Sequence, residues 1–149
     1  MRSAEAAAAR RPAKIANALA FAAPFSACSK RELRLVAKVA KTRAVRKGTT
    51  LMVEGESGES MVVLLSGGAD VHKGGRRIAQ IGSGDVVGEL AALTKCPRNA
   101  TVTMRTDGDI AVISRRDLRR LLKGSPSFSQ KLLEALALRV RELDRKLIP

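Results

Sequence analysis

The region from residue 42 to residue 114 consists of short runs of β-branched and aliphatic residues that glycine-containing turns separate. The runs are TRAVR, TTLMV, SMVVLLS, ADVHK, RIAQI, DVVGE, ATVTM and DIAVIS. Short strands recurring at roughly 8–12 residues, with turn residues between them, are typical of antiparallel sandwiches and barrels. The pattern therefore predicts an antiparallel β-fold, with a hairpin whose tight turn contains Gly74 and Gly75.

Helical periodicity precedes this region. Residues 13–22 keep apolar residues on one face, and Pro24 ends that segment. Ser29 and Glu32 then form a capping-box pattern, after which apolar residues recur at helical spacing. We therefore expect a second helix over residues 30–40.

Helical periodicity also follows the β-rich region. Residues 115–122 predict a short basic helix and residues 128–148 a long one, with a hinge in the KGSPS segment at Gly124, Ser125 and Pro126. Five apolar residues of the long helix fall at 3-4-3-4 spacing: Leu133, Leu136, Val140, Leu143 and Leu147. This stripe fits either a helix that packs along its own domain or the seam of a homodimer.

The length of 149 residues and the 45% hydrophobic content suit one domain with one core. Residues 1–12 are of low complexity and are expected to form a mobile tail. The predicted domain is 13–149, divided into N-terminal helices (13–41), a β-region (42–114) and C-terminal helices (115–148).

The formal net charge of +14 favours an anionic partner but is equally compatible with a solvated basic surface. A nucleic-acid-binding protein is one alternative, because cations are dense around the short basic helix. These cations are Arg115, Arg116, Arg119, Arg120 and Lys123. Aromatic residues make up only 2% of the chain, however, so the stacking platforms that bind single-stranded nucleic acid are nearly absent.

The sequence contains no pattern that predicts an enzyme, a metal site or a membrane span. Cys28, Cys96 and His72 are far apart, and we expect reduced thiols and an ordinary strand histidine. The segment IANALAFAA imitates a signal peptide, but it is short and Asn17 interrupts it. No apolar run reaches the roughly 18 residues of a membrane helix, so a cytoplasmic location is expected.

The stretch GELAALTKCPRNA (88–100) contains the residues best suited to bind a ligand. Gly88 permits close approach to the backbone, and one helical turn after it leaves N–H groups that favour an anion. Arg98 can clamp a phosphate, and the Glu89 carboxylate can accept a hydrogen bond from a neighbouring hydroxyl. A ribose with an attached phosphate meets both needs, whereas a surface ion pair between Glu89 and Arg98 is the simpler alternative.

GELAALTKCPRNATV (88–102) resembles the phosphate-binding cassette of the cyclic nucleotide-binding domain family. Three further pieces agree in order: KGTTLMVEGESGE (47–59), VVLLSGGADV (62–71) and GSGDVVGE (82–89). The resemblance covers residues 24–148. It implies an α+β, mainly β fold: an eight-stranded antiparallel β-roll, similar to a jelly-roll barrel, with the cassette inserted, helices before it and two helices after it.

The resemblance also implies a ligand and its contacts. The ligand would be cAMP rather than cGMP, without a metal, and the protein would be a non-enzymatic sensor with a mobile C-terminal lid helix. Arg98 would bind the cyclic phosphate and Glu89 the ribose 2′-hydroxyl. The remaining contacts would come from the backbone of Gly88, Leu90 and Ala91, from Asn99 and Ala100, from Val71 and Ile78 around the base, and from Arg139 on the lid.

This sequence departs from the family pattern at a few positions. Val87 replaces a frequent Phe, Met61 and Val62 stand where an aromatic residue is usual, and Asn99 stands where relatives carry Ala, Ser or Thr. An interaction module with a degenerate pocket is therefore a further alternative. No helix-turn-helix follows the long helix, so we expect either a stand-alone module or one excised from a longer protein, and we do not expect DNA binding.

Overall fold

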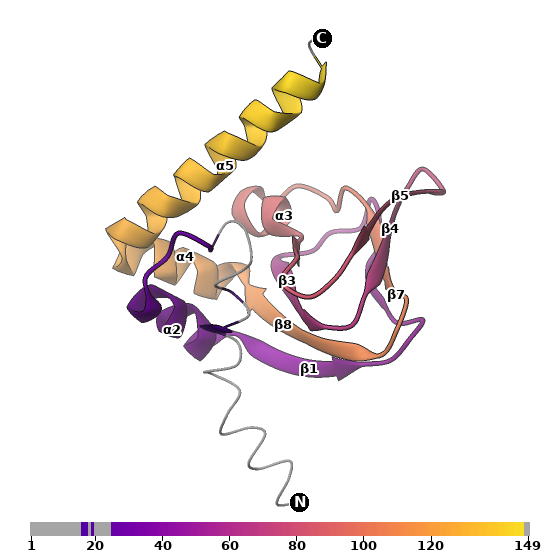
Figure 1. Cartoon of the computed structure of the whole chain (residues 1–149), viewed down its shortest axis with the longest axis horizontal. Coiled ribbons are helices and arrows are strands. Elements are labelled where there is room, and N and C mark those ends of the chain that lie inside the picture. The colour runs from indigo at the N-terminus through magenta and orange to yellow at the C-terminus, as the bar shows by residue number, and fades with distance from the viewer. Residues whose placement is uncertain (1–15, 18, 20–24, 148–149) are drawn as a thin grey trace, which may run out of the picture.

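The computed structural model describes residues 16, 17, 19 and 25–147. Within this part, eight strands form two four-stranded antiparallel sheets, the β-roll that the sequence predicts (Figure 1). The strands are β1 (Lys41–Val45), β2 (Thr50–Met52), β3 (Ser60–Ser66), β4 (Ala69–Lys73), β5 (Arg76–Ile81), β6 (Val86–Val87), β7 (Thr101–Met104) and β8 (Gly108–Ser114). One sheet has the order β1-β8-β3-β6 and the other β2-β7-β4-β5.

Strand β3 is apolar from Met61 to Leu65, and both of its faces are buried over residues 61–64. Met61 and Val63 belong to the core that the helices cover, whereas Val62 and Leu64 belong to the core inside the roll. Such a strand shows a continuous hydrophobic run instead of alternation. The central strand β3 thus separates two hydrophobic cores.

The predicted hairpin joins β4 and β5. Gly74 and Gly75 both have positive φ, at 60° and 77°, which is the conformation that a two-residue type I′ turn requires. Lys73 pairs with Arg76 directly across this turn. The Gly-Gly turn is therefore confirmed.

Helix α2 (Lys30–Val39) begins at the predicted capping box. The Ser29 N–H donates to Oε1 of Glu32 at 2.7 Å, and the Glu32 N–H donates to Oγ of Ser29 at 3.2 Å. Two of the backbone N–H groups that a helix start leaves unbonded are thereby satisfied. Of the helix expected over 13–22, Ala16, Asn17 and Leu19 are helical, and the remainder lies outside the described residues.

The two C-terminal helices are α4 (Arg115–Gly124) and α5 (Pro126–Leu147), so Ser125 alone separates them. The sequence predicts that the long helix begins at Phe128, but it begins two residues earlier. Proline suits the first position of a helix because its missing N–H would be unbonded there in any case. The Ser125 hydroxyl then accepts a hydrogen bond from the Phe128 N–H at 3.3 Å.

The helices gather at one end of the roll (Figure 1). Lys41 at the start of β1 pairs with Val112 near the end of β8, so α2 and α4 are attached to the same end of the sheet. The rings of Phe25 and Phe128 stack there, with centroids 5.9 Å apart. This contact fastens the base of α5.

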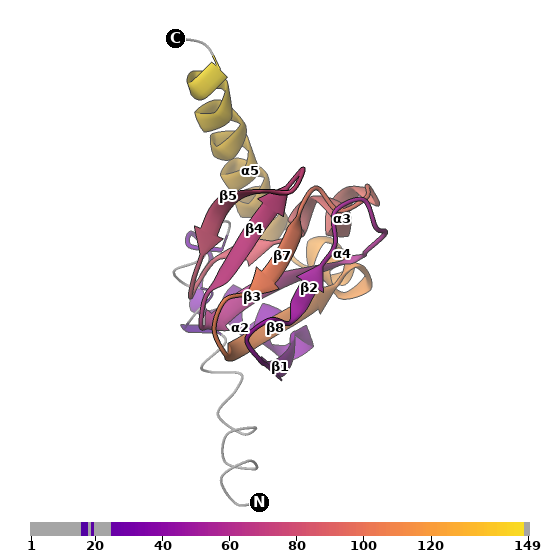
Figure 2. The same ribbon diagram turned by 90° about the vertical axis from the view of Figure 1, so that its right-hand side faces the viewer.

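The outer part of α5 extends away from the roll (Figure 2). Its apolar side chains Leu133, Leu138 and Val140 are 62–65% exposed, whereas Leu132 nearer the base is buried. Homodimerisation through this helix stays a prediction. No helix in the described ranges combines the length and the apolar character that a membrane crossing requires.

Candidate functional site

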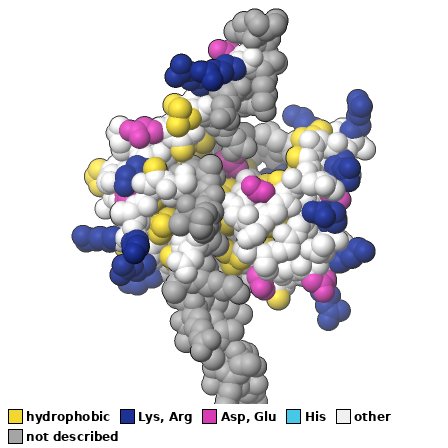
Figure 3. Space-filling view, in the orientation of Figure 1, with side chains coloured by type: hydrophobic (Ala, Val, Ile, Leu, Met, Phe, Trp, Pro, Cys, Tyr) yellow, Lys and Arg dark blue, Asp and Glu magenta, His cyan; other side chains and the backbone are white. Residues whose placement is uncertain are grey.

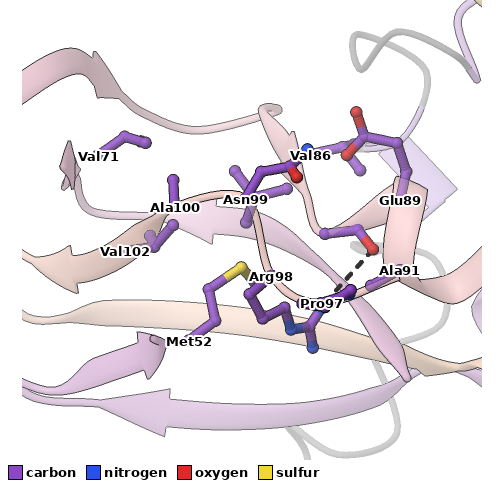
Figure 4. Close-up of a pocket in the computed structure, with 12 residues that line it drawn as sticks. Met52, Val71, Val86, Glu89, Ala91, Pro97, Arg98, Asn99, Ala100 and Val102 are labelled. Atoms are coloured by element: carbon purple, nitrogen blue, oxygen red, sulfur yellow. Dashed lines mark hydrogen bonds between the residues drawn. The ribbon is translucent and has the colours of Figure 1, made fainter. Parts of the chain in front are cut away.

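A pocket lies between the sheet containing β2, β7 and β4 and the short helix α3 (Glu89–Thr94). Its volume is about 180 Å³. The lining residues are Met52, Val71, Val86, Val87, Gly88, Glu89, Ala91, Pro97, Arg98, Asn99, Ala100 and Val102. The pocket therefore brings together seven of the residues that the sequence singles out, from strand β4 and from both ends of the 88–100 stretch (Figure 4).

The helical turn expected after Gly88 is present as α3, which has six residues. Gly88 has a φ of +81°, a left-handed conformation that glycine adopts without steric cost. A Cβ atom at this position would lie 2.6 Å from Nη1 of Arg98 and 3.0 Å from the Ser60 carbonyl oxygen. Gly88 is thus required both by the turn and by the close packing of Arg98.

Arg98 lies in the segment between α3 and β7, and only 8% of its surface is exposed. Its Nη1 donates to the carbonyl oxygen of Ser60 at 2.7 Å and, more weakly, to that of Gly88 at 3.4 Å. The backbone on either side is also bonded, because the Arg98 N–H donates to the Glu56 carbonyl and the Gly55 N–H donates to the Arg98 carbonyl, each at 2.9 Å. The position of the arginine is therefore fixed by main-chain contacts.

A second glycine makes room for the guanidinium. A Cβ atom on Gly58 would lie 2.6 Å from Cζ and 2.7 Å from Nη2 of Arg98, and nearer still to Nε. Gly58 and Gly88 thus contact the guanidinium from two segments of backbone, one before β3 and one before α3. Sequence reasoning assigned Gly58 no role, because only the fold brings the EGESGE segment against Arg98.

The electrostatics of Arg98 are those of a buried cation. Burial is the main influence and lowers the pKa of Arg98, while the nearby Cys96 thiol acts in the opposite direction. The ion pairs between described residues are Arg105–Asp70 and Lys131–Glu32, and neither involves Arg98. A buried cation without a carboxylate partner is costly, and an anionic ligand would lower that cost.

Glu89 is the first residue of α3 and is 7% exposed. Figure 4 shows its carboxylate and the Arg98 guanidinium directed to opposite sides of the segment that carries Pro97 and Asn99. The ion pairs between described residues do not include one between Glu89 and Arg98, so the surface pair that the chemistry of the stretch left open is not observed.

The apolar wall of the pocket comes from neighbouring strands. Met52 of β2 pairs with Val102 of β7, and Val102 pairs in turn with Val71 of β4. Val86 and Ala100 extend this wall. Sequence analysis identified Val71 and Ala100 but missed Met52, Val86 and Val102, since strand pairing between distant segments makes them neighbours.

Three of the residues predicted to contact the ligand are not among those that line the pocket. Ile78 lies on β5, is 59% exposed and falls at the register shift between the Val71↔Ala79 and His72↔Arg77 pairs. Leu90 lies in α3 and Arg139 in α5, and the side chains of both are outside the described part. Their roles stay predictions.

The pocket has the chemistry of a binding site for an anion with an apolar part. Within the described residues, no three His, Cys, Asp or Glu side chains are grouped so that they could hold a metal. His72 is half-buried in β4, and Cys28 and Cys96 are free thiols. The groups that could contact a ligand are therefore one cation, one carboxylate, the Asn99 amide and an aliphatic wall.

In a comparison with known protein families, the model described as "Cyclic nucleotide-binding domain" matches residues 42–125. A cAMP-dependent protein kinase regulatory subunit of Yarrowia lipolytica is 36% identical over 93 residues, which are 61% of this chain and 25% of that protein. The chain spans about a quarter of the length of the curated relatives it matches.

Solved structures agree with this match. A cyclic nucleotide-binding domain from Methylobacillus flagellatus superposes with a TM-score of 0.75 at 29% identity, covering 91% of this chain and 82% of that chain. The regulatory domain of Toxoplasma gondii PKA, crystallised with cAMP, superposes with a TM-score of 0.68 at 27% identity and covers 74% of this chain and 44% of that chain.

Proposed function

Because this chain belongs to the cyclic nucleotide-binding domain family, we propose that it binds cAMP in the pocket beside α3 and acts as a regulatory module rather than an enzyme. The similarity to cAMP-dependent regulatory subunits and to a cAMP-bound regulatory domain supports this ligand. The observation that carries the proposal is the buried guanidinium of Arg98, which lines the pocket and has no ion-pair partner among the described residues.

The cyclic phosphate would bind to Arg98. Both hydrogen bonds of the guanidinium to described residues use Nη1, so Nε and Nη2 supply the donors for the phosphate oxygens. The anion would also offset the cost of holding this cation in a buried site. The backbone of Gly88, Leu90 and Ala91 would supply further donors.

The ribose and the base would occupy the rest of the pocket. In this proposal the Glu89 carboxylate accepts a hydrogen bond from the ribose 2′-hydroxyl, since an ionised carboxylate can only accept hydrogen bonds. The aliphatic wall of Met52, Val71 and Val102 provides an apolar surface for the base. Asn99 is exposed at the rim, where its amide can select among ligands.

Closure over the base would involve α5. The pocket volume of about 180 Å³ is below the roughly 300–1,000 Å³ of typical ligand sites, so a nucleotide would extend beyond the pocket. Helix α5 follows a one-residue break at Ser125 and its outer part extends away from the roll. A ligand that contacts α5 in the closed position would shift the helix toward the roll and bring Arg139 toward the purine.

Calorimetric titration of the full chain with cAMP, cGMP and 5′-AMP tests the proposal. We expect saturable binding of cAMP with one site per chain, weaker binding of cGMP, and far weaker binding of 5′-AMP because its phosphate is not cyclic. The absence of any binding at about 0.1 mM cAMP would support an interaction module with a degenerate pocket instead. A single domain over 13–149 and a cytoplasmic location stay predictions.

A further inference from the structure

Helix α4 carries an unusual concentration of cations on one side. Arg115, Arg119 and Lys123 lie four residues apart, as do Arg116 and Arg120, so like charges are neighbours along the helix surface. Pairs of like charge at this spacing destabilise a helix. Arg115 and Arg116 also lie in the first turn, where the helix dipole favours negative charge.

These cations line a hollow of about 410 Å³. All five side chains contribute, together with Lys95 from the end of α3, and Glu59 is the one carboxylate among the described residues that line it. The hollow shares no lining residue with the pocket beside Arg98. Its lining therefore carries a large excess of positive charge at a site that the proposed function does not use.

Arg115 distinguishes this hollow from an ordinary basic surface. The residue is 8% exposed, although it lines the hollow, and its Nη1 atom is buried without a hydrogen-bond partner among the described residues. A buried guanidinium with an unpartnered nitrogen is costly, and an anion in the adjoining hollow would offset that cost electrostatically. Basic side chains appear on both flanks of the molecule (Figure 3), so positive charge alone does not single out a site.

We propose that this hollow binds a small anion carrying two or more phosphate groups. Several phosphates are needed to balance the five arginines and lysines of α4 together with Lys95. The volume lies within the range of small-molecule sites and favours a compact ligand over an extended strand. The chain has no Trp or Tyr, so the stacking that nucleic-acid binding commonly uses is not available here. The site does not depend on cAMP binding.

Titration with inorganic tripolyphosphate at about 0.15 M salt tests the proposal. The test variant is the double substitution Arg116→Gln and Arg120→Gln, both exposed helix positions where glutamine is well tolerated. The control is Arg76→Gln with Arg77→Gln, which removes the same charge from exposed β5. A third variant, Arg98→Gln, removes the cation of the other pocket. Unchanged melting temperatures show that all variants fold.

We expect saturable binding of one tripolyphosphate, weakened about tenfold or more by the α4 substitutions, because each removes a charge-assisted contact. Binding should change less than about twofold in the β5 control, where only long-range charge is lost. Retained binding in Arg98→Gln places the anion in the hollow. Equal losses in both double variants, or loss in Arg98→Gln, overturn the proposal. Binding of a DNA duplex or of anionic lipid vesicles without tripolyphosphate binding overturns it as well.

Discussion

Nη1 of Arg98 donates a 2.7 Å hydrogen bond to the carbonyl oxygen of Ser60, so the arginine of the 88–100 stretch is held by the first residue of β3. These two residues belong to segments that are far apart in the sequence. The bond fixes the guanidinium between Gly58 and Gly88, and the geometry of the proposed phosphate site therefore depends on residues outside the cassette.

Gly58→Ala tests this dependence. The added methyl group would overlap the Arg98 guanidinium. The guanidinium must then move, because the end of a long side chain is more flexible than the backbone. We expect cAMP affinity to fall about tenfold, through displacement of a charge-assisted contact, with little change in stability. Calorimetry measures the affinity. Gly82→Ala is the matched control, since its Cβ would meet nothing nearer than 4.0 Å; an equal loss in both variants would contradict the role of Gly58.

Glu89→Gln tests the assignment of the ribose. Glutamine keeps the size of the side chain but removes the charged acceptor, so affinity for cAMP should fall about tenfold. Affinity for 2′-deoxy-cAMP should change much less, because this ligand lacks the hydroxyl that is proposed to donate a hydrogen bond to Glu89. Titration of both proteins with both nucleotides completes a double-mutant cycle. Equal losses of affinity for the two nucleotides would show that Glu89 does not contact the 2′-hydroxyl.

Stability should fall in acid because of Glu32. Its carboxylate accepts a 2.6 Å hydrogen bond from Lys131, and this bond together with the Ser29 N–H holds the pKa of Glu32 at about 2, against 4.5 for an ordinary glutamate. A lowered pKa in the folded state stabilises the protein above pH 4.5, and that contribution is lost as the pH falls toward 2. Urea denaturation across this range measures the loss.

Glu32→Gln is the matched variant for that experiment. Glutamine at the third position of a helix still completes a capping box, so α2 keeps its first turn while the titrating group is removed. We expect a lower free energy of unfolding at neutral pH and a shallower decline between pH 4.5 and 2. A decline as steep as in the parent protein would mean that other carboxylates cause the acid sensitivity.

Phe128→Ala should detach the base of α5. The ring is 2% exposed and stacks on Phe25, so its removal leaves a cavity that costs about 3–5 kcal/mol of unfolding free energy. Leu133→Ala on the same helix is the control, because Leu133 is 65% exposed and should change stability by less than about 0.5 kcal/mol in the monomer. Similar effects from the two substitutions would contradict the anchoring role of Phe128.

Local patterns in the sequence predict most of the fold. The apolar run SMVVLLS matches β3, the Gly-Gly pair forms the hairpin turn, and the Ser29–Glu32 capping box begins α2. Each of these features is determined by a few neighbouring residues. The predicted start of α5 was wrong by two residues, because a proline that interrupts one helix also suits the first position of the next.

The site was only partly predictable for a different reason. Its polar residues lie in one stretch of sequence, but the aliphatic wall is made by the pairing of Met52 with Val102 and of Val102 with Val71. No local pattern encodes which strands pair across the roll. The same limit applies to α5, where the spacing of apolar residues shows a stripe but not the surface that covers it.

The pairing of β1 with β8 has a consequence for how the chain folds. Lys41 and Val45 bond to residues 112 and 108, so the first strand of the roll can be completed only after the last has been made. Contacts between such distant segments slow folding, and the edge of β1 stays open in the meantime. During synthesis, the roll closes only once β8 has left the ribosome, and until then β1 lacks the strand with which it pairs in the folded chain.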